Sequence, residues 1–588
     1  MSRPIHALIF LAATQVNPET ATTWRANMEK RFPNWADMLF HGPMKILVAT
    51  ETSTRWPGLA RFLPWLAVVV VCLFIAGIRL HLLEVPLERD EGEYAYAGQL
   101  ILKGIPPYEL AYNMKLPGTY YAYAAGMAVF GQTAAGIHLT LLVVNSLTCV
   151  FIFLLGRKLS GVTTGMAAVA SYAVMSVSPV VLGLAAHATQ FVALFAVAGA
   201  WLLWKALAAG GRRLFFLAGL LFGLAFMMKQ PGIVFGVFGL VVMAWDASQK
   251  GRLVSREFAL ALCNFSAGFW LPFLGFCLTA VVGGDFGRFW FWTFDYASCY
   301  AAGNSLREAS ETILDCFREQ GVLFLGFWLL AAAGLWAVVR GREKRSELAF
   351  LLAFAVFSAL GTTPGLYFRP HYFVVLLPAV ALLAGLGLGV LRAAWLPLRL
   401  RWAPAVGLIL TLTWNLYAQR AIFFQLSPQQ VNQAIYQGNP FIESLQIAQD
   451  ILQNSQPDAR VAVLGSEPQL YFYAHRLSAT GYIYTYPLME AQPYASRMQQ
   501  EMIGEIKAAK PEFIVMVSYK LSWLRQRASD LTILREMGRY LTQFYDPVAA
   551  VGRRTEAPAV LAGGSSTNAP PDSSPEAMTL FRRKAEAK

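Results

Sequence analysis

The sequence predicts a polytopic α-helical membrane protein with about eleven transmembrane helices and a small C-terminal α/β domain outside the membrane. The composition, the apolar runs and the distribution of basic residues carry this prediction. Of the 588 residues, 56% are hydrophobic and only 14% are charged, whereas soluble proteins have about 25% charged residues. Such a composition excludes an ordinary soluble enzyme and a disordered chain.

The apolar runs place the predicted helices. A membrane-spanning helix needs about 20 predominantly apolar residues. Eight segments meet this requirement well, and they are 62–80, 137–155, 162–179, 188–204, 258–281, 321–339, 372–391 and 403–419. Three weaker segments are 214–228, 231–245 and 348–361. Pro231 and Gly232 separate the first two of these, because both residues interrupt helices.

The basic residues predict the orientation. The formal net charge is +13. Alternate loops hold 15 Lys and Arg in 46 residues, and these loops are 156–161, 205–213, 246–257, 340–347 and 392–402. The intervening loops hold 8 in 100 residues. Because cytoplasmic loops are enriched in Lys and Arg, we expect a cytoplasmic N-terminus and an extracytoplasmic C-terminal region. The positive charge thus indicates orientation and no nucleic-acid partner.

The domain organisation follows from these patterns. We expect a polar N-terminal extension over 1–61, within which Met44 is a second plausible start, and a transmembrane domain over 62–420. Its large outer loops are 81–136 and 282–320. The region 430–585 is predicted to be the α/β domain, since strand-like segments at 460–465 and 512–517 alternate with helical patterns. Within it, 555–575 is rich in Ala, Pro, Gly and Ser and is predicted to be flexible.

An acidic cluster, Glu88-Arg89-Asp90-Glu91-Gly92-Glu93-Tyr94, follows the first predicted helix. Two interpretations are open. Asp90 can cap the next helix, with Glu91 and Glu93 favoured in its first turn by the helix dipole. Alternatively, one carboxylate at the outer face of the membrane serves as a general base.

Five further polar side chains map to the same outer side: Lys115, His187, Lys229, Arg369 and His371. Each on its own is explained as an ordinary interfacial residue whose charged end reaches the membrane surface. Charged groups at membrane depth usually face a cavity and mark a functional site. Their common side therefore predicts one site near the acidic cluster.

Cysteines and metal motifs add little. Cys299 and Cys316 lie in the same outer loop, where an oxidising compartment permits a disulfide; two free thiols are the alternative. The sequence has no CxxC, HExxH, DxD or Walker motif. We expect neither a metal site nor a cofactor.

Three short motifs resemble those of the GT-C superfamily, the polyprenyl-phosphate-sugar-dependent glycosyltransferases that include protein O-mannosyltransferases and the aminoarabinose and galacturonic acid transferases of lipid A and lipopolysaccharide. The segment Arg89–Tyr94 is similar to their acidic first-loop motif. Lys115-Leu116-Pro117 resembles a Lys-Pro-Pro element, from which Leu116 departs, and Phe368–Tyr372 resembles an Arg-Tyr-type stretch.

The resemblance implies transfer of a sugar from a polyprenyl-phosphate donor to a lipid, glycan or protein acceptor on the extracytoplasmic side. The resemblance implies Asp90 as the base, with Glu91 beside it. It implies Lys115 and Arg369 as phosphate ligands, with Lys229 and His371 as weaker candidates. Residues that would bind the acceptor or support the site are Glu93, Tyr94 and His187. A transporter or lipid flippase without transferase chemistry is the main alternative, and a non-catalytic assembly or receptor subunit is another.

Overall fold

The structure is a computed structural model of the chain. It describes residues 57–340, 345–392, 398–552 and 576–585. The predicted start at Met44, the extension as far as residue 56 and the whole predicted flexible segment 555–575 lie outside these residues.

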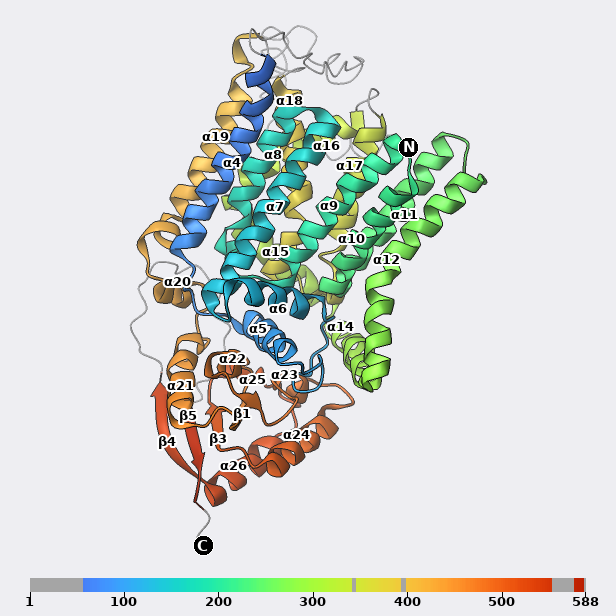
Figure 1. Ribbon diagram of the computed structural model, residues 1–588. Helices are drawn as coiled ribbons and strands as arrows, with labels where there is room; N and C mark the ends of the chain where they lie inside the picture. The colour runs from blue at the N-terminus through green and yellow to red at the C-terminus, as the bar shows by residue number, and fades with distance from the viewer. Residues whose placement is uncertain (1–56, 341–344, 393–397, 553–575, 586–588) are drawn as a thin grey trace, which may run out of the picture.

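Apolar helices form one bundle, and the C-terminal region lies at one of its ends, which we call the polar end (Figure 1). Each of the eleven predicted segments coincides with one of these helices. They are α4 (Pro57–His81), α7 (Ala134–Ser160), α8 (Val162–Ser176), α9 (Ala188–Ala209), α10 (Arg212–Met228), α11 (Ile233–Gln249), α12 (Arg256–Gly283), α16 (Leu325–Arg340), α17 (Arg345–Leu360), α18 (Leu377–Val390) and α19 (Ala403–Ala418).

The number of membrane spans is a separate question. In the described part of the chain, five helices are long and apolar enough to cross a membrane. The number rises to six if α15 (Leu306–Leu323) and α16, which meet at a bend of 99°, form one span. Four shorter apolar helices, α8, α17, α18 and α19, accompany them. The protein is thus mostly helical with several apolar helices, and the count of eleven spans stays a prediction.

Short helices lie across the polar end of the bundle. α5 (Arg89–Leu102) and α6 (Gly118–Phe130) lie between the bundle and the C-terminal region in Figure 1. α13 (Phe286–Trp290), a π-helical turn at 291–296 and α14 (Ala297–Ala301) follow α12. α20 (Pro428–Ile435) leads from α19 to the C-terminal region. The predicted outer loops are therefore largely helical.

The C-terminal region contains a mixed five-stranded sheet in the order β2-β1-β3-β5-β4. Its strands are β1 (Arg460–Leu464), β2 (Leu477–Ser478), β3 (Phe513–Val517), β4 (Tyr545–Gly552) and β5 (Ala577–Arg583). β1 pairs in parallel with β2 and β3, while β5 is antiparallel to β3 and β4. The helices of this region are α21 (Phe441–Asn454), α22 (Gln469–Ala474), α23 (Tyr486–Met489), α24 (Ala495–Ala509), α25 (Lys520–Trp523) and α26 (Thr532–Phe544).

β1 and β3 coincide with the two strand-like segments in the sequence, because buried strands read as continuous apolar runs. β4 and β5 lie on either side of a long connection and are only partly buried, so their pattern is weaker. The domain limits 62–420 and 430–585, and the location of the second outside the membrane, remain predictions.

α5 is docked directly against the C-terminal region. Arg89 forms an ion pair of 2.9 Å with the buried Glu467. Further along α5, the Tyr96 hydroxyl accepts a hydrogen bond of 2.8 Å from the Ser478 amide in β2. Gly92 lies so close to α22 that a Cβ atom on it would be 2.7 Å from the backbone nitrogen of Gln469. These contacts fix the acidic helix between the bundle and the sheet.

We expect Gly92→Ala to destabilise the protein, because the added methyl group would clash with the backbone of α22. Forcing an extra methyl group into a packed interface costs about 1–3 kcal/mol. Thermal unfolding of the purified protein measures the loss. Gly77→Ala is the matched control, because a Cβ atom added at Gly77 would meet nothing within 4 Å and alanine favours helix. Equal melting temperatures for Gly92→Ala and wild type would refute the proposed close packing.

Candidate functional site

The N-terminus of α5 presents the acidic cluster. Glu88 is the N-cap, and its side chain accepts the Glu91 amide at 2.8 Å. Glu91 accepts the Glu88 amide in return at 3.3 Å, which completes a capping box. The interpretation of Asp90 as the cap is therefore wrong. Asp90 lies in the first turn, and its carboxylate is available for other contacts.

Lys115 binds two of the acidic side chains. Its Nζ atom donates to Asp90 Oδ1 at 2.9 Å and to Glu93 Oε2 at 2.6 Å. It also lies 4.5 Å from the centre of the Tyr94 ring. Glu93 is completely buried and accepts a second hydrogen bond of 2.6 Å from the Tyr120 hydroxyl. The loop before α6 thus brings one cation to α5.

The surroundings of Asp90 and Glu93 shift the pKa values of these two carboxyl groups in opposite directions. Burial raises the pKa of Asp90, but the charge and the hydrogen bond of Lys115 outweigh it and hold the pKa well below its ordinary value. Burial also raises the pKa of Glu93, which Lys115 only partly opposes. The Asp90 side chain is 24% exposed, whereas that of Glu93 is inaccessible. Asp90 is therefore the ionised carboxylate that a substrate can reach.

Asp90 and Lys115 line a cavity of about 220 Å³. Lys229, Arg369 and His371 line the same cavity. Its other walls are largely aromatic and come from three distant segments, represented by Trp292, Tyr296, Tyr300, Tyr372, Tyr484 and Tyr486. Two carboxylates, Asp90 and Glu490, and three basic side chains therefore meet around a space bounded by both the bundle and the C-terminal region.

The two further cations are held by aromatic residues. Lys229 follows the end of α10, and its Nζ atom lies 3.8 Å from the centre of the Tyr372 ring. Arg369 donates to the Tyr300 hydroxyl at 3.1 Å and lies over the Tyr367 ring. Within the described parts of the chain, neither residue forms an ion pair with a carboxylate. Both are thus oriented while their charge stays available for an anion.

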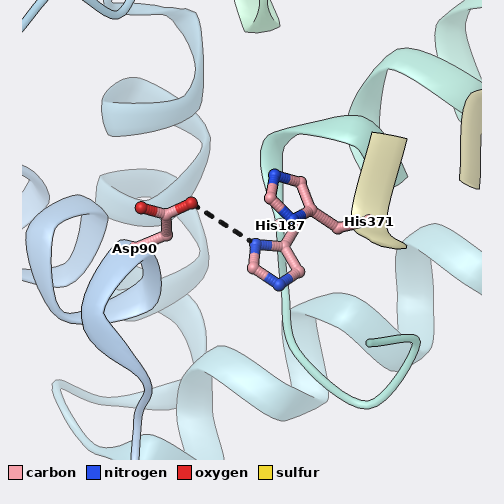
Figure 2. A group of neighbouring side chains, drawn as sticks. All are labelled: Asp90, His187 and His371. Atoms are coloured by element: carbon pink, nitrogen blue, oxygen red, sulfur yellow. Dashed lines mark ion pairs between the residues drawn. The ribbon is translucent and has the colours of Figure 1, made fainter. Parts of the chain in front are cut away.

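His187 and His371 stand beside Asp90 with their rings stacked, 4.2 Å between centres and 13° between planes (Figure 2). His187 Nδ1 is 3.8 Å from Asp90 Oδ2. Neither ring nitrogen of the buried His187 has a hydrogen-bond partner among the described residues. Burial lowers the pKa of His187 to about 4 and that of His371 well below its ordinary value. Both imidazoles are therefore neutral and can accept or donate a hydrogen bond.

Donor atoms of Asp90, His187 and His371 all lie within 4.8 Å of one another, so these residues could hold a metal ion. Two features oppose this. Imidazole lone pairs lie in the ring plane, and nearly parallel rings do not direct them at one point. The positive charge of Lys115 and Arg369 at the same cavity repels a cation.

We therefore predict that chelation leaves the activity of this site unchanged. Treating the purified protein with EDTA, removing the chelator and assaying without added metal should give the untreated rate. Loss of activity that Zn²⁺ or Mn²⁺ restores would contradict this prediction and assign the three side chains to a metal.

Some functional residues were missed by sequence reasoning. The Tyr484 hydroxyl donates to Asp90 Oδ1 at 3.2 Å, although 394 residues separate the two. Glu490 lines the cavity and accepts a 2.6 Å hydrogen bond from Tyr296. The aromatic residues within 289–300 form another wall of the cavity, and their clustering in the sequence could have indicated it. Glu91, in contrast, is not among the residues that line the cavity.

The predicted disulfide is not formed. Cys299 on α14 and Cys316 on α15 are both free thiols. Cys316 is buried and its Sγ atom donates to the Phe368 carbonyl at 3.2 Å, so α15 directs this thiol at the segment that carries Arg369.

A bundle of apolar helices with a carboxylate and several cations around a cavity at one end is the architecture that the resemblance to the GT-C superfamily implies. The family model described as dolichyl-phosphate-mannose-protein mannosyltransferase matches residues 115–274. This match includes Lys115, His187 and Lys229 but neither Asp90 nor Arg369.

Relatives point to the same superfamily. The undecaprenyl phosphate-alpha-4-amino-4-deoxy-L-arabinose arabinosyl transferase of Pseudomonas aeruginosa (strain UCBPP-PA14) is 27% identical over 299 residues, which is 45% of this chain and 54% of the relative. The protein from strain PAO1 matches equally. The chain thus spans about half the length of these curated relatives.

Solved structures confirm the fold. The crystal structure of ArnT from Cupriavidus metallidurans bound to undecaprenyl phosphate has a TM-score of 0.50 at 17% identity, covering 78% of this chain and 93% of that one. Its apo form matches with the same score. The chain therefore has the fold of GT-C membrane glycosyltransferases, and the predicted resemblance to this superfamily is confirmed.

Proposed function

We propose that the protein is a membrane glycosyltransferase that moves a sugar from a polyprenyl-phosphate donor to a hydroxyl group of a lipid, glycan or protein acceptor on the extracytoplasmic side. The observation that supports it best is the cavity in which the ionised Asp90 faces three basic side chains, Lys115, Lys229 and Arg369. An anionic leaving group and a proton acceptor are both accommodated there.

The chemistry divides between these groups. The acceptor oxygen forms a bond to the anomeric carbon while the bond from that carbon to the phosphate oxygen breaks. The electron pair leaves with the phosphate, and the acceptor proton passes to Asp90. A carboxylate of low pKa is a weak base, but the acceptor hydroxyl becomes strongly acidic as its new bond forms. Proton transfer late in the reaction therefore suits Asp90.

The cations stabilise the charge on the departing phosphate. Lys115 uses two of its three N–H donors on Asp90 and Glu93, which leaves one for a phosphate oxygen. Arg369 offers its planar fork of donors, a geometry suited to phosphate. Because these charges are fixed before the substrate binds, they cost no reorganisation during the reaction. The undecaprenyl phosphate bound to ArnT in the related solved structure supports a polyprenyl-phosphate donor for this protein.

A donor-consumption assay tests this function. The purified protein in liposomes is given a panel of polyprenyl-phosphate-linked hexoses and pentoses together with envelope lipids and glycans as acceptors. We expect release of polyprenyl phosphate and a matching mass gain in one acceptor, which should be missing in a deletion strain. Movement of lipid across the liposome membrane without release of polyprenyl phosphate would overturn the proposal and favour a flippase.

Lys229 predicts a pH dependence of donor binding. Burial lowers the pKa of Lys229 to about 7, although Asp90 opposes this effect. The amine is therefore charged below pH 7 and becomes neutral above it, so we expect the KM for the donor to rise between about pH 6 and about pH 9. Arginine remains protonated throughout this range, so Lys229→Arg should flatten the profile. Lys103→Arg is the control; a profile in Lys229→Arg that matches the wild type would exclude Lys229 as the cause.

A further inference from the structure

Glu91 is buried and does not line the cavity. Its Oε1 atom accepts the amide of Ala186 at 2.7 Å and lies 3.2 Å from His138 Nε2. Its Oε2 atom accepts the amide of Glu88. Glu91 thus connects the start of α5, which carries Asp90, with the segment that leads into His187 and α9. Its position explains how Asp90, which lines the cavity, and His187 are held relative to each other.

His138 lies on the opposite side of this carboxylate, in the second turn of α7, and is 5% exposed. Its Nδ1 atom is 2.7 Å from the Leu83 carbonyl. A carbonyl oxygen only accepts hydrogen bonds, so Nδ1 must carry a proton. The Nε2 atom faces Glu91 Oε1, which also acts only as an acceptor when ionised. Both ring nitrogens therefore face acceptors.

Two backbone amides donate to Glu91, which favours its ionised form. Burial raises the pKa of Glu91, but His138 and the Ala186 amide outweigh it and hold the pKa below its ordinary value. A neutral His138 would direct the lone pair of Nε2 at this carboxylate, which is repulsive. The contacts are satisfied when His138 carries both protons and forms a buried ion pair with Glu91.

Arg79 is a second cation that stabilises the turn between α8 and α9. Arg79 of α4 is 3% exposed and donates to the carbonyls of Ser176 and Gly183. These carbonyls flank the turn between α8 and α9, on which Ala186 also lies. Arg79 therefore holds this turn from α4 while His138 and Glu91 hold it from α7 and α5. The Arg79 charge also attracts Glu91, but among the described residues the cation in direct contact with a Glu91 oxygen is His138, at 3.2 Å.

We propose that His138, as a charged imidazolium, is a positioning residue of the transferase site: by pairing with Glu91 it fixes the spacing between Asp90 and His187. The proposal rests on the proposed function for its kinetic part only. Glu91 has, on this basis, no contact with substrate and acts through the Ala186 amide and the N-terminus of α5. A displacement of about 1 Å at a reacting group costs on the order of 10²-fold in rate, so loosening this link should lower kcat.

The test is a double-mutant cycle with His138→Gln, Glu91→Gln and the double variant. His138→Gln leaves a buried carboxylate without its cation, and Glu91→Gln leaves an imidazolium without its anion. We expect each single variant to lower kcat on the order of 10²-fold with little change in KM, to lower the melting temperature and to speed amide hydrogen exchange over 182–190. In the double variant both buried charges are gone, so each loss should be smaller than the sum of the two single losses, although the NH₂ group at position 91 then faces one of the two backbone amides that Glu91 accepted.

His475→Gln is the control, because His475 is an exposed histidine whose Nδ1 atom also bonds a side chain, that of Gln99. It should behave as wild type. If His138→Gln leaves melting and exchange unchanged, or if the losses of the two single variants simply add in the double variant, the charged pair is refuted. Melting and exchange need no transferase assay, so these outcomes are independent of whether the proposed reaction is correct.

Discussion

Replacing Asp90 by asparagine is expected to reduce kcat by about 10²–10⁴-fold, the usual contribution of a positioned general base. Asparagine has the same shape and can still accept hydrogen bonds from Lys115 and Tyr484, which both bind Oδ1. It cannot take a proton. Lys229 and Arg369 remain at the cavity, so the effect should fall mainly on kcat. Initial rates at saturating donor measure the effect.

The folded state should tolerate this change. The depressed pKa of Asp90 means that its ion pair adds stability above the unfolded-state pKa, and that this stability is lost as the pH falls through the folded-state pKa. Asp90→Asn removes the contribution at neutral pH, but Glu93 still holds Lys115 at 2.6 Å. Glu109→Gln, an exposed carboxylate in the same outer segment, is the matched control. A folded Asp90→Asn protein with the wild-type rate would exclude Asp90 as the base.

Charge in the predicted outer loops was the most informative signal in the sequence. Asp90, Lys115, Lys229, Arg369 and His371 are spread over 282 positions, yet all line one cavity. A charged side chain at membrane depth costs free energy unless it faces a cavity or a partner. Such side chains are therefore rare, and each of them is a useful marker of a functional site. His187 lies beside Asp90 and stacks on His371, within the same group.

The remaining walls could not be predicted, since no local pattern specifies which distant surfaces meet. Tyr484 and Glu490 come from the C-terminal region, and their hydroxyl and carboxyl groups look like ordinary surface groups in sequence. The cap of α5 was also misassigned. Aspartate is the better N-cap by propensity, but Glu88 lies three residues before Glu91 and the two complete a reciprocal capping box. The reciprocal contact between Glu88 and Glu91 therefore outweighs the general preference of aspartate for the N-cap position.

The number of membrane spans could not be predicted securely from the sequence either, because it too depends on structure beyond the local pattern. Hydropathy locates apolar runs, but helix length depends on local breaks. α8, α17, α18 and α19 have 14 to 16 residues, less than the 17–25 residues of an ordinary span. The 99° bend between α15 and α16 likewise has no clear sequence marker.

Lys115→Met is expected to lower both stability and activity. The change leaves Asp90 and Glu93 without their shared cation. Removing one partner of a buried ion pair costs about 3–5 kcal/mol; we expect about 3 kcal/mol, because the Lys115 and Asp90 side chains are 18% and 24% exposed. The pKa of Asp90 should rise, so the acidic limb of the pH–rate profile should move to higher pH. Lys103→Met is the control for loss of an exposed lysine in the same segment.

The double variant Glu93→Gln with Lys115→Met separates the two roles of the lysine. Glu93 is inaccessible and accepts from Tyr120 as well as Lys115, so neutralising it removes the unpaired buried charge, and the melting temperature should return toward wild type. The rate should stay low, because losing one preorganised donor for a developing negative charge costs about 10²–10³-fold. Recovery of both properties together would mean that Lys115 only balances buried charge. Recovery of stability alone would show that its third N–H donor is used by the departing phosphate.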